Sequence, residues 1–214
     1  TENGIKYIKQ DGSVGYYQTV NKTTPVAGDV KYVDRNGDGV VDDNDRDIIG
    51  NPNPDFTYGF QTKVSWKSLS LSASFNGVQG RDILNVGNRY NNTPGTKSNN
   101  VTRKAFQNMW TDENPSNLYP KSTFVVQNMV MDRYVEDGSY LRCSDITLSY
   151  VLPAKWTNKI GIKNTSVYAS VKNAFVITDY SGYDPEVNSF AFDGLRPGVD
   201  MNSYPTPRSF VFGL

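Results

Sequence analysis

The stretch Phe56-Thr-Tyr-Gly-Phe-Gln-Thr-Lys-Val-Ser-Trp66 decides the fold class of this chain. Its even positions carry mostly large apolar or aromatic side chains, and its odd positions carry small or polar ones. Such a two-residue period is typical of a β-strand with one face toward apolar surroundings and the other toward water. After Lys67 the alternation restarts with apolar residues separated by single serines, namely Leu69, Leu71, Ala73 and Phe75. The sequence therefore predicts a β-hairpin over residues 55–77 with a tight turn.

Three further parts of the chain show the same period. Two of them lie within residues 140–177, and the last begins near Arg208. No charged residue stands on the apolar side of these strands, whereas their opposite sides carry Lys63, Asp145 and Lys172. The sequence thus predicts an all-β chain with about five antiparallel strands.

The composition excludes several classes of protein. With 22 basic and 22 acidic residues the formal net charge is zero, so we expect no nucleic-acid partner. The chain has no histidine, which removes the usual general base and the commonest zinc ligand, and we expect no catalytic residues. The single cysteine, Cys143, allows no internal disulfide and is expected to fill apolar space. The mean hydropathy of −0.56 argues against a transmembrane helix but permits a membrane β-barrel, whose strands are apolar at every second residue.

Two architectures accommodate strands with one apolar face. In a soluble sandwich this face packs on a second sheet, and in an outer-membrane barrel it meets lipid. The connections favour the barrel, because one or two residues join the first two strands whereas residues 78–139 separate the second from the third. Short turns that alternate with very long loops are typical of outer-membrane barrels. The alternative is a soluble, calcium-stabilised β-sandwich that binds carbohydrate.

Residues 34–45, Asp-Arg-Asn-Gly-Asp-Gly-Val-Val-Asp-Asp-Asn-Asp, have the spacing of a calcium-binding loop. Oxygen donors stand at its ligand positions, and a glycine stands at the turn position between them. The predicted ligands are Asp34, Asn36, Asp38, the carbonyl of Val40, Asp42 and Asp45. A strand-like segment precedes the loop, which argues against a paired EF-hand sensor. We expect a structural calcium ion, and the alternative is a solvated turn.

The long loops carry four aromatic residues among asparagine, aspartate and serine: Tyr90, Trp110, Tyr119 and Tyr183. Flat rings stack on sugar faces while amides and carboxylates bond hydroxyls, so these residues are candidates to face substrate or a partner protein. The alternative is that they pack the loops together. Residues 102–110 are expected to form a short helix that buries Ala105, Phe106 and Met109. A carboxylate pair, Asp184 and Glu186, would suit glycoside hydrolysis, but neighbouring carboxylates in a loop are usually solvated.

Longer segments, spread along the chain in order, carry a family resemblance. They are GDVKYVDRNGDG (28–39), DRDIIGNPNPDFTYGF (45–60), MWTDENPS (109–116), DGSYLR (137–142), LPAKW (152–156), DYSGYDPEV (179–187), YPTPR (204–208) and FVFGL (210–214). Together they resemble the SusC/RagA-type TonB-dependent transporters of Bacteroidetes outer membranes. The resemblance implies a barrel of about 22 strands around an N-terminal plug, with this chain as its C-terminal quarter.

The resemblance further implies an importer of glycans, and in some members of peptides. A SusD-like surface lipoprotein would close over its mouth, TonB would act through the missing N-terminal part, and lipid would surround the barrel. It also implies a topology for each region. The extracellular regions would be 1–54 (with the loop 34–45), 78–139 and 178–204, and the barrel would include the hairpin 55–77, the strands and periplasmic turn of 140–177, and a truncated last strand, 205–214.

Overall fold

The computed structural model describes residues 6–8, 12–16, 26–93, 100–122, 130–162, 165–186 and 188–214. Parts of the predicted regions 1–54, 78–139, 140–177 and 178–204 lie outside these described residues. The chain forms two compact units: one comprises Thr1–Ile49 and Asn88–Val130, and the other comprises Gly50–Gly87 and Met131–Leu214. No helix of the described residues is long and apolar enough to span a membrane.

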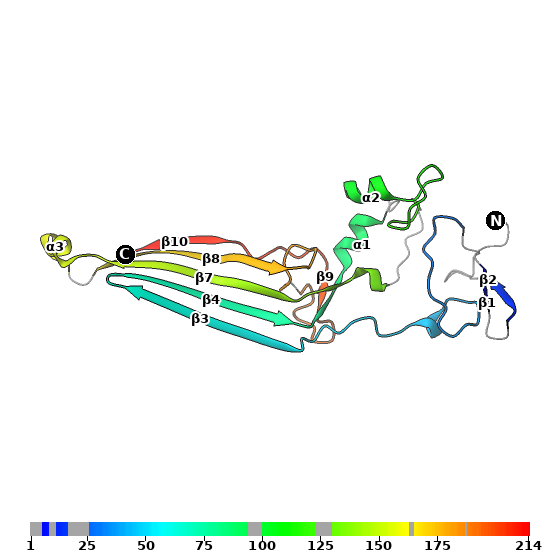
Figure 1. Ribbon diagram of the computed structural model, residues 1–214, viewed down its shortest axis with the longest axis horizontal. Helices are drawn as coiled ribbons and strands as arrows, with labels where there is room; N and C mark the ends of the chain where they lie inside the picture. Colours follow the sequence, from blue (N-terminus) through cyan, green and yellow to red (C-terminus); the bar gives the residue numbers. More distant parts are fainter. Residues whose placement is uncertain are drawn as a thin grey trace. The chain divides into compact units, whose positions relative to one another are not determined.

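A five-stranded antiparallel sheet forms most of the larger unit (Figure 1). Its strands lie in the order β10-β8-β7-β4-β3, so chain neighbours are also spatial neighbours. The strands are β3 (Phe56–Trp66), β4 (Leu69–Gln79), β7 (Tyr140–Val151), β8 (Ser166–Thr178) and β10 (Ser209–Gly213). The predicted all-β class with about five barrel strands is confirmed, and β4 continues to Gln79, beyond the predicted 55–77.

Register in the β3–β4 hairpin follows the sequence pattern. Trp66 pairs with Leu69 across a two-residue turn, and Phe60 pairs with Phe75. Cross-strand partners share a face, so Val64 meets Leu71 on the apolar face and Lys63 meets Ser72 on the polar face. The stacked rings of Phe60 and Phe75, with centroids 4.5 Å apart, reinforce the apolar face.

A β-bulge interrupts the sheet in the middle of β7. Ser74 and Phe75 are adjacent in β4 but pair with Asp145 and Cys143, so Ser144 is the extra residue of β7. An inserted residue reverses which side chains point to which face. Cys143 therefore lies on the apolar face, fully buried between the paired residues Phe75 and Phe175, which agrees with its predicted role as a filler.

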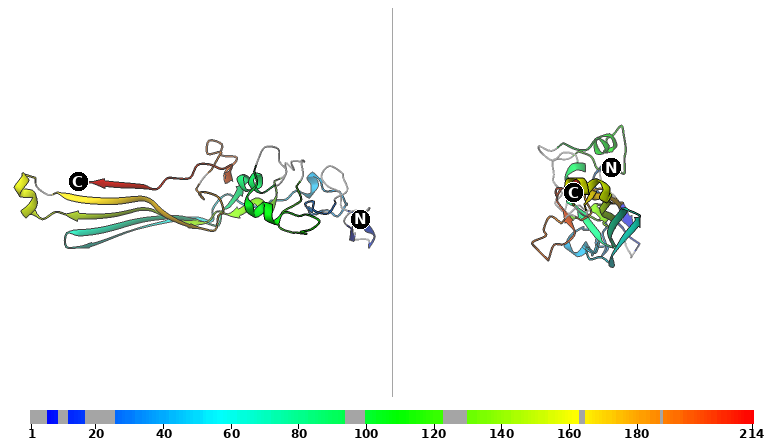
Figure 2. Two further views of the ribbon diagram at one scale, coloured as in Figure 1. Left: turned by 90° about the horizontal axis from the view of Figure 1, so that it is seen from above. Right: turned by 90° about the vertical axis from the view of Figure 1, so that its left-hand side faces the viewer.

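A second, three-stranded sheet forms within the regions that the sequence placed in loops. It comprises β5 (Asp82–Asn85), β6 (Val135–Asp137) and β9 (Val199–Asp200) in the order β6-β5-β9, and its β5–β9 pair is parallel. Figures 1 and 2 place β9 at the end of the main sheet opposite α3. The larger unit also contains η2 (Asp132–Tyr134), α3 (Ala154–Thr157) and η3 (Asn158–Ile160), and α1 (Val86–Asn92) begins in it and continues into the smaller unit.

The smaller unit has few regular elements among its described residues. Its regular elements are β1 (Lys6–Ile8), β2 (Val14–Tyr16), η1 (Asp43–Asp45) and α2 (Arg103–Asn108). The hydroxyl of Thr102 accepts the Ala105 N–H and caps α2, so a helix forms where residues 102–110 predicted one. Ala105 is buried as expected, but Phe106 is 63% exposed, so the expected burial of Phe106 is wrong. A helix of two turns has too narrow a face to bury both.

Candidate functional site

One face of the main sheet presents large apolar side chains to the outside. Val64, Trp66 and Phe212 are 64%, 69% and 76% exposed. Within the described residues no second sheet pairs with or covers this face, as a β-sandwich would require. A contiguous exposed apolar surface usually contacts lipid or another protein.

The opposite face of the same sheet is polar and hydrogen-bonded. The carboxylate of Asp145 pairs with the ammonium group of Lys172 and accepts the hydroxyls of Thr147 and Ser170, each at 2.8 Å. The ammonium group of Lys172 is half-exposed. Charged groups of this kind are costly in hydrocarbon and inexpensive beside water. The two faces therefore require different surroundings.

A buried ion-pair cluster lies at the end of this sheet that is near β9. We name Arg142, Asp184, Glu186 and Tyr140 the Arg142 cluster. The guanidinium of Arg142, 5% exposed, pairs with Asp184 and lies 3.0 Å, Nε to Oε2, from Glu186. The phenol of Tyr140 donates to Glu186 at 2.6 Å, and Asn76 donates to the same oxygen at 3.1 Å. The cluster fastens the loop after β8 to the ends of β4 and β7.

Asp184 is held ionised by its partners. Burial would by itself raise the pKa of its carboxyl group, but the backbone N–H groups of Glu186 and Thr206 and the Arg142 guanidinium lower that pKa below its usual value. The N–H of Glu186 lies 2.9 Å from Oδ1, and the N–H of Thr206 lies 3.1 Å from Oδ2. A carboxylate with a lowered pKa is a poor general acid, so the geometry does not favour the hydrolase reading of Asp184 with Glu186.

Further hydrogen bonds hold the same loop. The phenol of Tyr180 donates to Asp200 at 2.7 Å, and Asp200 is 2% exposed. Burial and then this hydrogen bond to a carboxylate raise the pKa of the Tyr180 phenol well above its usual value. The carboxylate of Glu136 accepts the backbone N–H of Ser181 at 2.8 Å and the amide of Asn85 at 3.0 Å. These hydrogen bonds, together with the Arg142 cluster, hold the described residues of loop 178–204 in place.

Sequence reasoning did not identify these anchors. Arg142 was the available signal, because a lone arginine inside an apolar strand needs a partner when it is buried. Its partner Asp184 lies 42 residues further along the chain. Likewise, Glu186 lies 46 residues after Tyr140, its hydrogen-bond partner. Sequence spacing alone does not reveal such pairs.

The four predicted loop aromatics do not form one cluster within a unit. Trp110 and Tyr119 lie together in the smaller unit, where the backbone N–H of Trp110 donates to the backbone carbonyl of Tyr119 at 3.0 Å. The Trp110 ring covers Gly28, where an added Cβ would lie 2.5 Å from it, so Trp110 packs against another segment of the same unit. Tyr90 lies on α1 in the smaller unit, and Tyr183, 71% exposed, lies in the larger one. Their assignment to substrate or partner stays a prediction.

The carboxylates of the loop 34–45 bind backbone N–H groups. Asp34 accepts from Gly37 and Gly39, each at 2.7 Å. Asp45 accepts from Arg35 and Asp42, each at 2.8 Å, and so closes the loop on itself.

The remaining predicted ligands also have local partners. Asn36 donates its amide to Asp38 at 3.0 Å, Asp38 accepts the Val40 N–H at 2.8 Å, and Asp42 caps η1. Across the part of the chain that the structure describes, no three acidic or cysteine side chains are close enough to hold a metal ion. The oxygen-rich donor set suits calcium chemically, but its carboxylates are turned toward the backbone, so calcium binding stays a prediction.

Comparison with known proteins gives consistent results. No family model matches the chain. It is 34% identical over 197 residues to the TonB-dependent receptor P26 of Formosa agariphila, covering 88% of this chain and 19% of the relative. It is also 34% identical over 190 residues to the TonB-dependent receptor SusC of Bacteroides thetaiotaomicron, covering 86% of this chain and 17% of the relative. The structure of the RagAB peptide transporter matches 77% of this chain and 17% of that chain, with a TM-score of 0.65 and 28% identity.

An antiparallel sheet with one exposed apolar face, one polar face and docked loops at one end is a segment of a β-barrel wall. The chain belongs to the SusC/RagA-type TonB-dependent receptors. It spans about one fifth of the length of the curated relatives that it matches.

Proposed function

We propose that this chain forms part of the wall of a TonB-dependent importer in the bacterial outer membrane. The main support for this proposal is that the two faces of the sheet differ. The exposed apolar face suits contact with lipid, and the face with the Asp145–Lys172 ion pair suits a water-filled lumen. Within the described residues the edges of β3 and β10 have no further strand partner. An open sheet edge is not tolerated in lipid, so further strands would complete the barrel.

We propose oligosaccharides or other glycans as the substrates, with peptides as the second candidate class. The exposed ring of Tyr183 and the polar loops around it support a glycan, because aromatic rings stack on sugars. The second class is supported by the relative described as the RagAB peptide transporter. A SusD-like lipoprotein would cover the loop end, and the plug and TonB contact would come from the N-terminal part of the receptor.

The experiment is native mass spectrometry of detergent-extracted outer membrane from cells that make this protein. Peptides from β3 and from residues 180–186 should co-migrate with a polypeptide about five times the length of this chain, as its relatives are, together with a surface lipoprotein. Deletion of the gene should then abolish growth on a glycan, or on a peptide, that the parent strain consumes. Recovery of the peptides only from the soluble fraction, as a lone 23.9 kDa chain, would contradict the proposal and favour the soluble sandwich.

We further propose that the loop 34–45 binds a structural calcium ion. Its oxygen donors and turn glycine support this, and a modest affinity would suffice outside the cell. In the intact receptor, millimolar calcium should protect this loop from a protease, and a chelator should remove the protection.

A variant separates calcium binding from loop packing. Asp38→Asn keeps the acceptor for the Val40 N–H but loses one negative charge, so the calcium concentration that protects the loop should rise roughly tenfold. Asp112→Asn removes an exposed charge elsewhere in the same unit and should leave that concentration unchanged. Protection that does not depend on calcium in any of the three proteins would show that the loop is a solvated turn.

A further inference from the structure

The end of the main sheet with the short connections carries tryptophan and lysine. Trp66 and Lys67 lie in the β3–β4 hairpin, Lys155 and Trp156 lie on α3, and Lys159 lies on η3. Figures 1 and 2 show the hairpin and α3 at the same end of the sheet, away from β9. We name these five residues the Trp/Lys surface.

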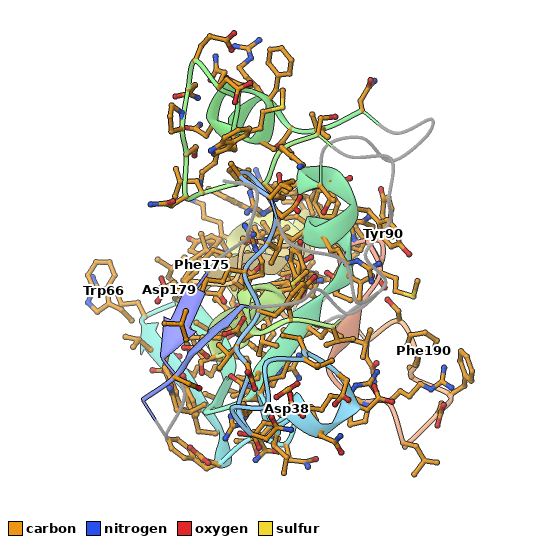
Figure 3. All side chains as sticks on the ribbon, turned by 90° about the vertical axis from the view of Figure 1, so that its right-hand side faces the viewer. Asp38, Trp66, Tyr90, Phe175, Asp179 and Phe190 are labelled. Atoms are coloured by element: carbon orange, nitrogen blue, oxygen red, sulfur yellow. The ribbon has the colours of Figure 1, made fainter. Side chains whose placement is uncertain are left out.

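Both indoles of the Trp/Lys surface face the outside. Trp66 is 69% exposed and Trp156 is 61% exposed. Figure 3 shows Trp66 projecting outward from the edge of the sheet. An indole has an apolar body and one N–H donor, and this combination suits the boundary between lipid chains and headgroups.

In the described parts of these two connections all charged side chains are positive. Residues 64–70 and 152–162 contain no aspartate or glutamate, and their only charged residues are the three lysines. Within the described residues none of the three is in an ion pair. The surface therefore lacks an anionic partner of its own.

The backbone of Lys67 adds an independent indication. Its φ of +54° lies in the left-handed region, where hairpin turns usually place glycine or asparagine. The ammonium group of Lys67 lies 4.8 Å from the centre of the Trp66 ring. Trp66 pairs with Leu69 and so belongs to the apolar face. A positive charge is thus held where the apolar face ends.

We propose that the Trp/Lys surface binds the headgroups of anionic phospholipids at the short-turn end of the barrel. This inference rests on the proposed membrane location of the chain. The lysines would pair with lipid phosphates while Trp66 and Trp156 lie at the base of the headgroups. Continuity with the apolar face favours a lipid over a free phosphate, because a soluble anion would not use the neighbouring apolar surface.

The test uses the intact receptor in nanodiscs of phosphatidylethanolamine with a minor fraction of phosphatidylglycerol. After release into detergent, native mass spectrometry counts the lipids retained per receptor. The triple variant K67Q/K155Q/K159Q should lower the retained ratio of phosphatidylglycerol to phosphatidylethanolamine by at least about fivefold, since one interfacial lysine contributes a factor of roughly five. The control K63Q/R103Q/K104Q removes the same charge elsewhere and should leave the ratio unchanged. An unchanged ratio in the first variant, or an equal fall in the control, would overturn the inference.

A second measurement distinguishes failure of this inference from failure of the proposed location. Brominated lipid quenches the fluorescence of tryptophans that contact it. The emission of Trp66 is the difference between the parent receptor and W66F, and that of Trp156 is the difference between the parent and W156F. In vesicles of brominated lipid, both of these contributions should be quenched. If that emission is not quenched at all, the membrane location itself is wrong. If it is quenched equally in vesicles with and without phosphatidylglycerol, and the retained ratio is unchanged in the triple variant, only the headgroup preference is wrong.

Discussion

Replacement of Arg142 by methionine should detach the loop after β8 from the sheet and reduce its stability by about 3–5 kcal/mol. Methionine fills similar volume but leaves the Asp184 carboxylate, 3% exposed, without a positive partner. Glu186 is partly exposed and can regain water, so the cost falls mainly on Asp184. Native-state hydrogen exchange of residues 179–186 in the intact receptor would measure the change.

Arg196→Met is the matched control in the same loop. Arg196 pairs with Asp193 at 3.3 Å, but its side chain is 64% exposed, so its loss should cost at most about 1 kcal/mol. The double variant Arg142→Met with Asp184→Leu removes both buried charges and should recover most of the lost stability. Equal effects of Arg142→Met and Arg196→Met would show that the Arg142 cluster does not hold the loop.

Acid should release the same loop. The pKa of Asp184 is lower in the folded protein than in the unfolded chain, so its contribution to stability is fully present above about pH 4. That contribution is lost as the pH falls through the lower, folded value. In Arg142→Met the pKa of Asp184 loses one lowering influence, so release should begin at a higher pH. Exchange rates measured from pH 6 downward would show this shift.

Replacement of Leu148 by arginine should prevent stable insertion of the receptor. Leu148 is 45% exposed on the apolar face of β7, between its partners Leu71 and Ala169. A charge that faces lipid costs up to about 2–4 kcal/mol, with the full cost at the bilayer midplane. The amount of receptor that resists unfolding by detergent at room temperature, compared with the boiled sample, would report the loss.

Two control variants show whether the apolar face contacts lipid or packs in a protein core. Ser149→Arg changes the next residue of the same strand, which points to the polar face, and should be tolerated. Leu148→Trp enlarges the apolar side chain, which lipid accommodates but a packed protein core resists at a cost of about 1–3 kcal/mol. If Leu148→Trp destabilises as strongly as Leu148→Arg, the face packs on protein and the sandwich architecture regains support.

Much of the fold could be read from local patterns. The alternation in Phe56–Trp66 and Leu69–Gln79 identified both strands and their turn, because side chains alternate strictly across a pleated strand. The carboxylate-rich loop was also evident, since its hydrogen bonds, such as Asp34 with Gly37, join residues only a few positions apart. The small sheet was missed, because its parallel pair joins Leu84 to Val199 across most of the larger unit.

Local alternation was enough to predict the five strands of the main sheet, each with one apolar and one polar face. Strand periodicity depends on neighbouring residues alone. The direction of the Arg142 side chain, in contrast, depends on how the strands pair. Counted by alternation from Ile146, Arg142 would lie on the apolar face, but the extra residue Ser144 reverses the faces and turns it toward Asn76. Its pairing with Asp184 then depends on a loop that returns from β8, and no local pattern encodes that return.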